Sequence, residues 1–169
     1  GRAVVGICLG SQLLARALGG TVAPLEGGIE LGWLPVRLTP DGREDPVFAG
    51  IAWESRRLHF HRWHVAEPPP GTTLLASSDR CRVQAWRCGM RSYGFQYHLE
   101  AHRERIGQWC EQDPGSLSEA GVTREGIDAG TEAHWESAAR LADRVFDRLA
   151  MLVMPLDRRV AGIARDLHH

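Results

Sequence analysis

The segment that most constrains the fold runs from residue 3 to residue 20. Its first six residues are small or β-branched and predict a strand, and residues 12–18 have helical composition and stop at Gly19-Gly20. Gly6-Ile7-Cys8-Leu9-Gly10 joins the two, so the connection must be a sharp turn that carries Cys8. Glycines on both sides of such a turn permit a strained backbone that projects a nucleophile away from the chain. The segment therefore predicts an α/β unit with a thiol at a strand-to-helix junction.

Cys8 has a catalytic and a structural interpretation. At a helix N-terminus the partial positive charge favours the thiolate, and the Leu9 N–H points to where an oxyanion would develop. The structural alternative is a buried thiol in a glycine-rich turn. A thiolate nucleophile also needs a base and a group that orients the base. His98 and Glu100 supply both at the end of a strand, although such a pair in isolation is more often a surface ion pair.

The rest of the chain interleaves strands with helices, which indicates α/β architecture. We expect a turn at Pro40-Asp41-Gly42, a single helical turn after Asp45 and a break at Asp113-Pro114-Gly115. Strands are predicted at 21–24, 32–38, 57–65, 73–76, 82–87 and 92–98, and helices at 100–111 and 133–153. The last helix has an apolar stripe made of Trp135, Ala138, Ala142, Val145, Leu149 and Leu152. We predict one domain over residues 1–155 and a short helical or disordered tail over residues 156–169.

Composition excludes several functions. The 169 residues carry a formal net charge of −1, so we predict no nucleic-acid partner, and no window is apolar enough to predict a membrane span. All 20 basic residues are Arg, which excludes a Schiff-base or P-loop lysine. The four cysteines show no C-x-x-C pair, so we expect free thiols and a cytoplasmic location.

Two histidines raise the question of a metal. His59 and His61 share one face of a predicted strand, but the sequence indicates no third ligand beside them. We therefore predict that the protein uses no metal and no cofactor.

Two segments together resemble one known family. Val5-Gly6-Ile7-Cys8-Leu9-Gly10-Ser11-Gln12 and Tyr93-Gly94-Phe95-Gln96-Tyr97-His98-Leu99-Glu100 are similar to the motifs of triad-type (Cys-His-Glu) class I glutamine amidotransferases. The chain is most similar to stand-alone members that resemble the amidotransferase domain of GMP synthase. The resemblance implies a flavodoxin-like fold and a triad of Cys8, His98 and Glu100. It also implies that oxyanion and substrate contacts come from Leu9, Gly10, Gln12 and His64.

The chain departs from the family pattern at three places. Leu99 stands where the family usually has Pro, and Val65-Ala66-Glu67-Pro68 follows Trp63-His64 where the family has Gly-Asp. The strands that precede the Cys8 turn in the family, with a loop that supplies the second oxyanion N–H, have no counterpart. We therefore expect an N-terminally incomplete domain. Loss of one oxyanion donor costs on the order of 10²–10³ in rate, so we expect these 169 residues alone to be close to inert.

The resemblance implies hydrolysis of L-glutamine to glutamate and ammonia through a γ-glutamyl thioester on Cys8. The ammonia would pass to an unidentified acceptor on a synthetase domain or subunit. One alternative is a hydrolase that uses the same triad on γ-glutamyl peptides or γ-glutamyl amines. The other is a non-catalytic domain of this fold that binds a partner or regulates a synthetase.

Overall fold

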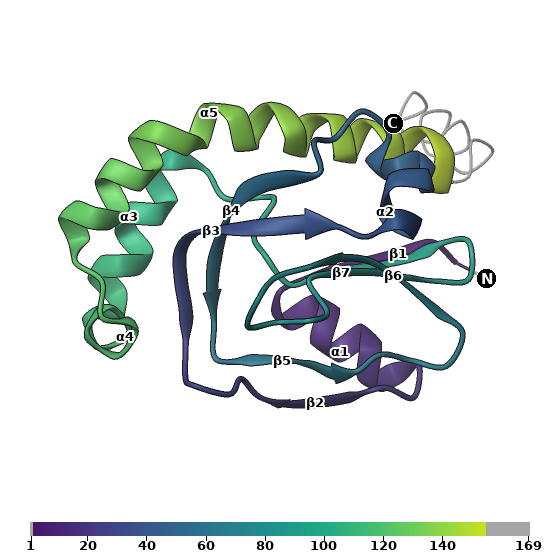
Figure 1. Cartoon of the computed structure of the whole chain (residues 1–169), viewed down its shortest axis with the longest axis horizontal. Coiled ribbons are helices and arrows are strands. Elements are labelled where there is room, and N and C mark those ends of the chain that lie inside the picture. Colours follow the sequence, from purple (N-terminus) through teal and green to yellow (C-terminus); the bar gives the residue numbers. More distant parts are fainter. Residues whose placement is uncertain (1, 155–169) are drawn as a thin grey trace, which may run out of the picture.

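A curled six-stranded sheet forms the centre of the protein. The structure is a computed structural model that describes residues 2–154. In spatial order the strands are β1 (Val4–Ile7), β8 (Ser92–Phe95), β7 (Ala85–Cys88), β6 (Thr72–Ser77), β3 (Glu30–Leu38) and β4 (Glu54–His61) (Figure 1). β1 pairs with β8 in parallel, and the pairings from β8 through to β4 are antiparallel. The parallel pair brings two distant segments to one edge of the sheet.

A second, two-stranded sheet consists of β2 (Thr21–Pro24) and β5 (Trp63–Glu67). Helix α1 (Leu9–Ala17) lies between this pair and the main sheet (Figure 1). The predicted single strand over residues 57–65 is wrong, because the chain leaves the main sheet after His61 and enters the small sheet at Trp63. Arg62 occupies the corner, where its guanidinium donates hydrogen bonds to Glu119 and Ser116.

The other helices cover the opposite face and one end. They are α2 (Pro40–Glu44), α3 (Arg103–Gln112), α4 (Pro114–Ala120) and α5 (Arg124–Arg148), with a 3₁₀ turn η1 (Pro46–Phe48) and a π-helical turn η2 (Leu149–Val153). The single helical turn predicted after Asp45 is confirmed as η1.

Three predicted helix boundaries are wrong because side-chain caps were overlooked. Residues 40–42, predicted as a turn, begin α2, and the Thr39 hydroxyl oxygen accepts a hydrogen bond from the Gly42 N–H. Pro114 begins α4 at a position that suits proline, rather than only ending α3. Helix α5 begins at Arg124 instead of residue 133, because Thr123 caps it through the Gly126 N–H.

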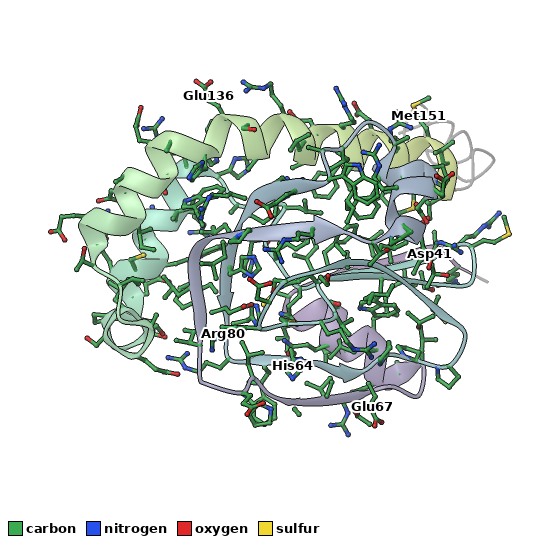
Figure 2. The ribbon with its side chains drawn as sticks, viewed as in Figure 1. Asp41, His64, Glu67, Arg80, Glu136 and Met151 are labelled. Atoms are coloured by element: carbon green, nitrogen blue, oxygen red, sulfur yellow. The ribbon has the colours of Figure 1, made fainter. Side chains whose placement is uncertain are left out.

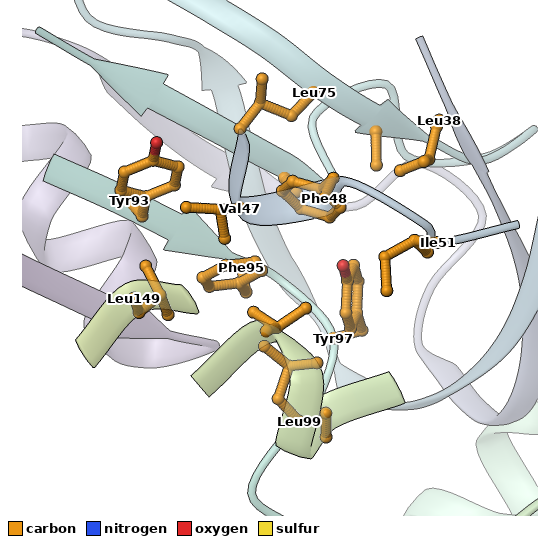
Figure 3. Packing of buried hydrophobic residues seen from close by; sticks show 14 of the residues in the cluster. Leu38, Val47, Phe48, Ile51, Leu75, Tyr93, Phe95, Tyr97, Leu99 and Leu149 are labelled. Carbon is orange, nitrogen blue, oxygen red and sulfur yellow. The ribbon is translucent and has the colours of Figure 1, made fainter. Parts of the chain in front are cut away.

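The main core lies between the sheet, η1 and the end of α5. Figure 3 shows Phe48, Phe95 and Tyr97 packed against one another, with Leu149 reaching them from the C-terminal helical segment. The predicted stripe is confirmed at Ala142, Val145 and Leu149, which are buried, but Leu152 is 55% exposed. The wider π-helical turn shifts the spacing there, so Val153 is buried in its place.

Two further expectations concern the chain as a whole. Within residues 2–154 all four cysteines are free thiols, as predicted. No helix in that range has an apolar stretch long enough to span a membrane. The predicted tail over 156–169 lies outside the described residues.

Candidate active site

The parallel pairing of β1 with β8 brings Cys8 close to the segment that carries His98. Ile7 is in register with Phe95, and the Cys8 N–H donates a 2.8 Å hydrogen bond to the Phe95 carbonyl. Three residues further on, the His98 N–H donates to the Leu58 carbonyl of β4 at 2.9 Å. Both side chains therefore emerge at the carboxyl edge of the parallel pair, where open α/β sheets place their sites.

Cys8 has a strained backbone. Its φ of 49° and ψ of −110° make it the one non-glycine residue with positive φ among residues 2–154. Gly6 makes the turn sterically feasible, since a Cβ there would lie 2.5 Å from the Gly10 carbonyl oxygen. A Cβ on Gly10 would meet nothing within 4 Å. Leu9 and Gly10 open helix α1, and N–H groups in a first helical turn have no acceptor within the helix.

His98 and Glu100 form the predicted pair. The His98 Nδ1 lies 2.7 Å from the Glu100 Oε1, which leaves Nε2 for a reaction partner. Burial by itself would lower the pKa of His98, but hydrogen bonds with Cys8 and Glu100 outweigh it and raise that pKa to about 9. Burial likewise opposes the charge of Glu100, yet the hydrogen bond from His98 holds its pKa below the usual value. The pair is therefore an imidazolium and a carboxylate at neutral pH.

A cavity of about 490 Å³ opens over Cys8 and His98. Gln12 lines it and is held by its amide nitrogen, which donates to the Trp63 carbonyl at 2.7 Å and to the Gln96 Oε1 at 3.2 Å. The Trp109 ring forms another wall, with its centroid 4.9 Å from that of His98. The cavity thus combines a thiol, an imidazole and an oriented amide with aromatic walls.

The structure brings together most of the predicted site residues. Cys8, Gln12 and His98 share the cavity, and Glu100 lies behind His98. His64 does not line the cavity: it lies half-buried on β5, opposite Ala23 of β2 (Figure 2). Its neighbour Trp63 approaches the cavity instead, through both its side chain and the carbonyl that holds Gln12.

Sequence reasoning missed several cavity residues. Phe60, Arg62 and Trp109 also line the cavity. Arg62 and Phe60 are there because the chain changes sheets at this point, a corner that the predicted continuous strand did not contain. Trp109 arrives on α3, and its helical position alone carries no signal for it.

One group of residues has the composition of a metal site. Glu30 of β3 lies beside His59 and His61 of β4, and all three are buried. Glu30 is the third ligand type that the sequence did not indicate. It lies far from the histidines along the chain, and only the β3–β4 register, with Glu30 opposite His61, brings it to them.

Comparison with known proteins places the chain in a family. The family model for glutamine amidotransferase class-I matches residues 1–112. The chain belongs to the class-I glutamine amidotransferases. Over 104 residues it is 39% identical to the amidotransferase subunit of the glutamine-hydrolyzing GMP synthase of Haloquadratum walsbyi, a match that spans 60% of this chain and 55% of that protein. Over 121 residues it is 36% identical to the glutamine amidotransferase-like protein YfeJ of Salmonella typhimurium, covering 70% of this chain and 49% of YfeJ.

Solved structures agree on the fold. A glutamine amidotransferase from Thermotoga maritima superposes with a TM-score of 0.77 at 25% identity, over 87% of this chain and 62% of that one. One from Methylobacillus flagellatus gives 0.77 at 26% identity, over 90% and 64%. The fold is therefore the flavodoxin-like fold of this family, as predicted. The chain spans about half the length of the first two curated relatives named here.

Proposed function

We propose that this domain hydrolyses L-glutamine to glutamate and ammonia with Cys8 as the nucleophile. The observation that carries the proposal is the meeting of Cys8, on its strained turn, with the His98–Glu100 pair at one cavity. A strained turn at a helix N-terminus is costly to maintain, and such strain is concentrated at functional sites. An imidazolium beside the thiol supports the charge distribution that nucleophilic attack requires.

The reaction follows from these positions. The Cys8 thiolate attacks the carboxamide carbon of glutamine, and the Leu9 N–H donates to the oxyanion that forms. His98 gives its Nε2 proton to the departing amine, so that ammonia leaves and a γ-glutamyl thioester remains on Cys8. Neutral His98 then takes a proton from water, whose oxygen attacks the thioester. Glutamate leaves, the Cys8 sulfur departs as thiolate, and His98 is again the imidazolium.

Gln12 and the aromatic walls support a role in substrate binding. The Gln12 amide nitrogen is committed to the Trp63 carbonyl and to Gln96, so the side chain is held in one orientation at the cavity wall. A fixed amide of this kind suits recognition of the polar end of an amino acid. Trp63 and Trp109 would enclose the methylene part of the substrate.

A synthetase would consume the ammonia. The relatives named above include a component of the glutamine-hydrolyzing GMP synthase, which supports a synthetase as the partner protein. The exposed Leu9 and Leu13 of α1 and the half-exposed Trp63 lie around the Cys8 turn and cavity mouth, a surface suited to a partner.

Hydroxylamine trapping tests the proposed thioester. The protein is incubated with glutamine and hydroxylamine, and γ-glutamyl hydroxamate is quantified after a long incubation that detects even a slow enzyme. We expect hydroxamate from the wild type and from Cys88→Ala, the other half-buried thiol, and none from Cys8→Ala. Equal hydroxamate from Cys8→Ala would contradict the proposal.

The same assay separates glutamine from its nearest rivals. γ-Glutamyl peptides and γ-glutamyl amines present the same carbonyl group with a larger leaving amine. We expect the highest yield with free glutamine, because Gln12 occupies the position that the family uses for this substrate. A higher yield with a γ-glutamyl amine would assign the triad to that substrate class instead.

A further inference from the structure

A buried group of three side chains lies below the active-site cavity, and we call it the Glu30 cluster. It consists of Glu30, His59 and His61, which are 2%, 0% and 4% exposed. The Glu30 Oε2 lies 3.0 Å from the His61 Nε2 and 3.4 Å from the His59 Nδ1, and the two nitrogens lie 3.4 Å apart. The proposed reaction uses none of these atoms.

The hydrogen-bond partners of His61 fix which of its nitrogens faces the cluster as an acceptor. Its Nδ1 lies 3.0 Å from the Trp63 carbonyl oxygen, which can only accept, so the Nδ1 carries the proton. In neutral His61 the Nε2 therefore presents a lone pair to the Glu30 carboxylate. The carboxylate is ionised: burial raises its pKa, but the hydrogen bonds with His59 and His61 outweigh burial and lower it.

His59 faces the cluster in the same way. Its Nδ1 lies 3.5 Å from the Gln84 Nε2, an amide nitrogen that can only donate. Burial lowers the pKa of His59, which favours the neutral ring with a lone pair on Nδ1. Its Nε2 is one of five buried side-chain atoms that lack a hydrogen-bond partner among residues 2–154, and the Gln84 Oε1 is another. The partnerless atoms thus gather around this cluster.

Three acceptor atoms that converge at 3.0–3.4 Å in a dry interior need a cation between them. Tetrahedral zinc, with ligands at about 2.0–2.1 Å, separates neighbouring ligand atoms by about 3.3–3.4 Å. The measured triangle matches one face of that tetrahedron. Two imidazoles and one carboxylate also form a ligand set that zinc uses in proteins.

We propose that Glu30, His59 and His61 bind one zinc ion beneath the active-site cavity. Gln84 then supports a metal ligand, because its amide nitrogen donates to the Glu30 Oε2 at 3.2 Å and orients the carboxylate. The His61–Trp63 hydrogen bond does the same for one imidazole. His61 lines the cavity, so the ion enters from that side.

The site would stabilise the floor of the cavity. Phe60 lies between the two histidine ligands, and its carbonyl oxygen lies 3.9 Å from the Cys8 Sγ. On the far side, the Arg80 guanidinium donates to the Ile29 carbonyl at 3.1 Å and holds the backbone next to Glu30 (Figure 2). Zinc would therefore bridge β3 and β4 where β4 meets the nucleophile.

Metal titration of the full chain tests the proposal, using Zn²⁺ as the probe and Co²⁺ as its spectroscopic substitute. The Cys8→Ser variant removes the thiol that offers a competing site in the cavity. We expect it to keep one zinc per chain after dialysis, and its Co²⁺ form to show the intense visible bands of four-coordinate cobalt without thiolate charge transfer. Folded Cys8→Ser protein that binds no zinc would overturn the proposal and leave a proton as the shared cation.

Ligand variants locate the site. We expect His61→Gln to weaken zinc binding by on the order of 100-fold or more, since changes to residues that only orient the ligands already cost about 10–100-fold. His134→Gln, which replaces a half-buried histidine elsewhere, serves as the matched control and should bind zinc as the wild type does. Unchanged zinc affinity in folded His61→Gln would also overturn the proposal. Because a variant of a buried histidine can fail to fold, the Cys8→Ser measurement stands by itself.

Discussion

Replacing Cys8 by glycine should stabilise the domain relative to replacing it by alanine. At φ 49° and ψ −110° any residue with a Cβ is strained, by about 1–3 kcal/mol. Glycine relieves this strain but gives back about 0.4–1 kcal/mol through the greater freedom of its unfolded chain. It also loses a half-buried methyl group, worth about 0.4 kcal/mol at half the burial energy of a CH₂. Taking the middle of each range, the balance is about 1 kcal/mol in favour of glycine.

Urea denaturation of the two variants measures this difference, because both lack the thiol and its hydrogen bonds. A gain of about 1 kcal/mol corresponds to a melting temperature higher by about 2–4 °C in a chain of this size. The matched control is Cys110, which lies within helix α3, where glycine should be less stable than alanine by about 1 kcal/mol. If Cys8→Gly is no more stable than Cys8→Ala while the Cys110 pair behaves as expected, the strain argument is wrong.

Three further predictions concern the triad and its support. Glu100→Gln should lower hydroxamate formation by on the order of 10²-fold, because the His98 imidazolium loses its charged partner; an unchanged rate in a steady-state comparison would exclude that role. Acylation should decline as the pH rises through about 9, where His98 loses the proton that the leaving amine needs, and a pH–rate profile that is flat to higher pH would contradict this. Because this pKa is raised above the unfolded value of about 6.5, the stability that His98 contributes should be complete below that pH and lost by about pH 9 in urea titrations. Gly94→Ala should destabilise the domain by about 3 kcal/mol, since the new Cβ would lie 2.2 Å from the buried Trp86 ring and 2.6 Å from the Ser11 Oγ; a loss below about 1 kcal/mol in denaturation would show that the ring moves aside easily.

The Cys8 turn could be predicted from the sequence because its constraint is local. A short strand, a helix and two glycines leave a single kind of connection, and the structure adds that Gly6 alone is required by space. The apolar stripe of α5 was equally local and is correct as far as Leu149. It fails at Leu152, since a π-helical turn depends on packing rather than on periodicity.

The features that the sequence did not reveal depend on contacts between distant segments. Residues 54–67 alternate throughout, and nothing in that alternation marks the corner at Arg62, which is tied to α4 by side-chain hydrogen bonds. Glu30 reaches His61 through the cross-strand register of β3 and β4. Trp109 meets His98 because α3 folds back over the cavity. None of these contacts leaves a periodic signal along the chain.

Covalent labelling by a glutamine-analogue electrophile tests the central claim most directly. The protein is treated with a diazoketone analogue of glutamine, with and without excess glutamine, and the adduct is located by peptide mass spectrometry. We expect one adduct, on Cys8, that glutamine suppresses and that is absent from Cys8→Ala, while Cys88 stays unmodified. Labelling of another residue, or labelling of Cys8 that glutamine does not suppress, would contradict the assignment of Cys8 as the glutamine-directed nucleophile.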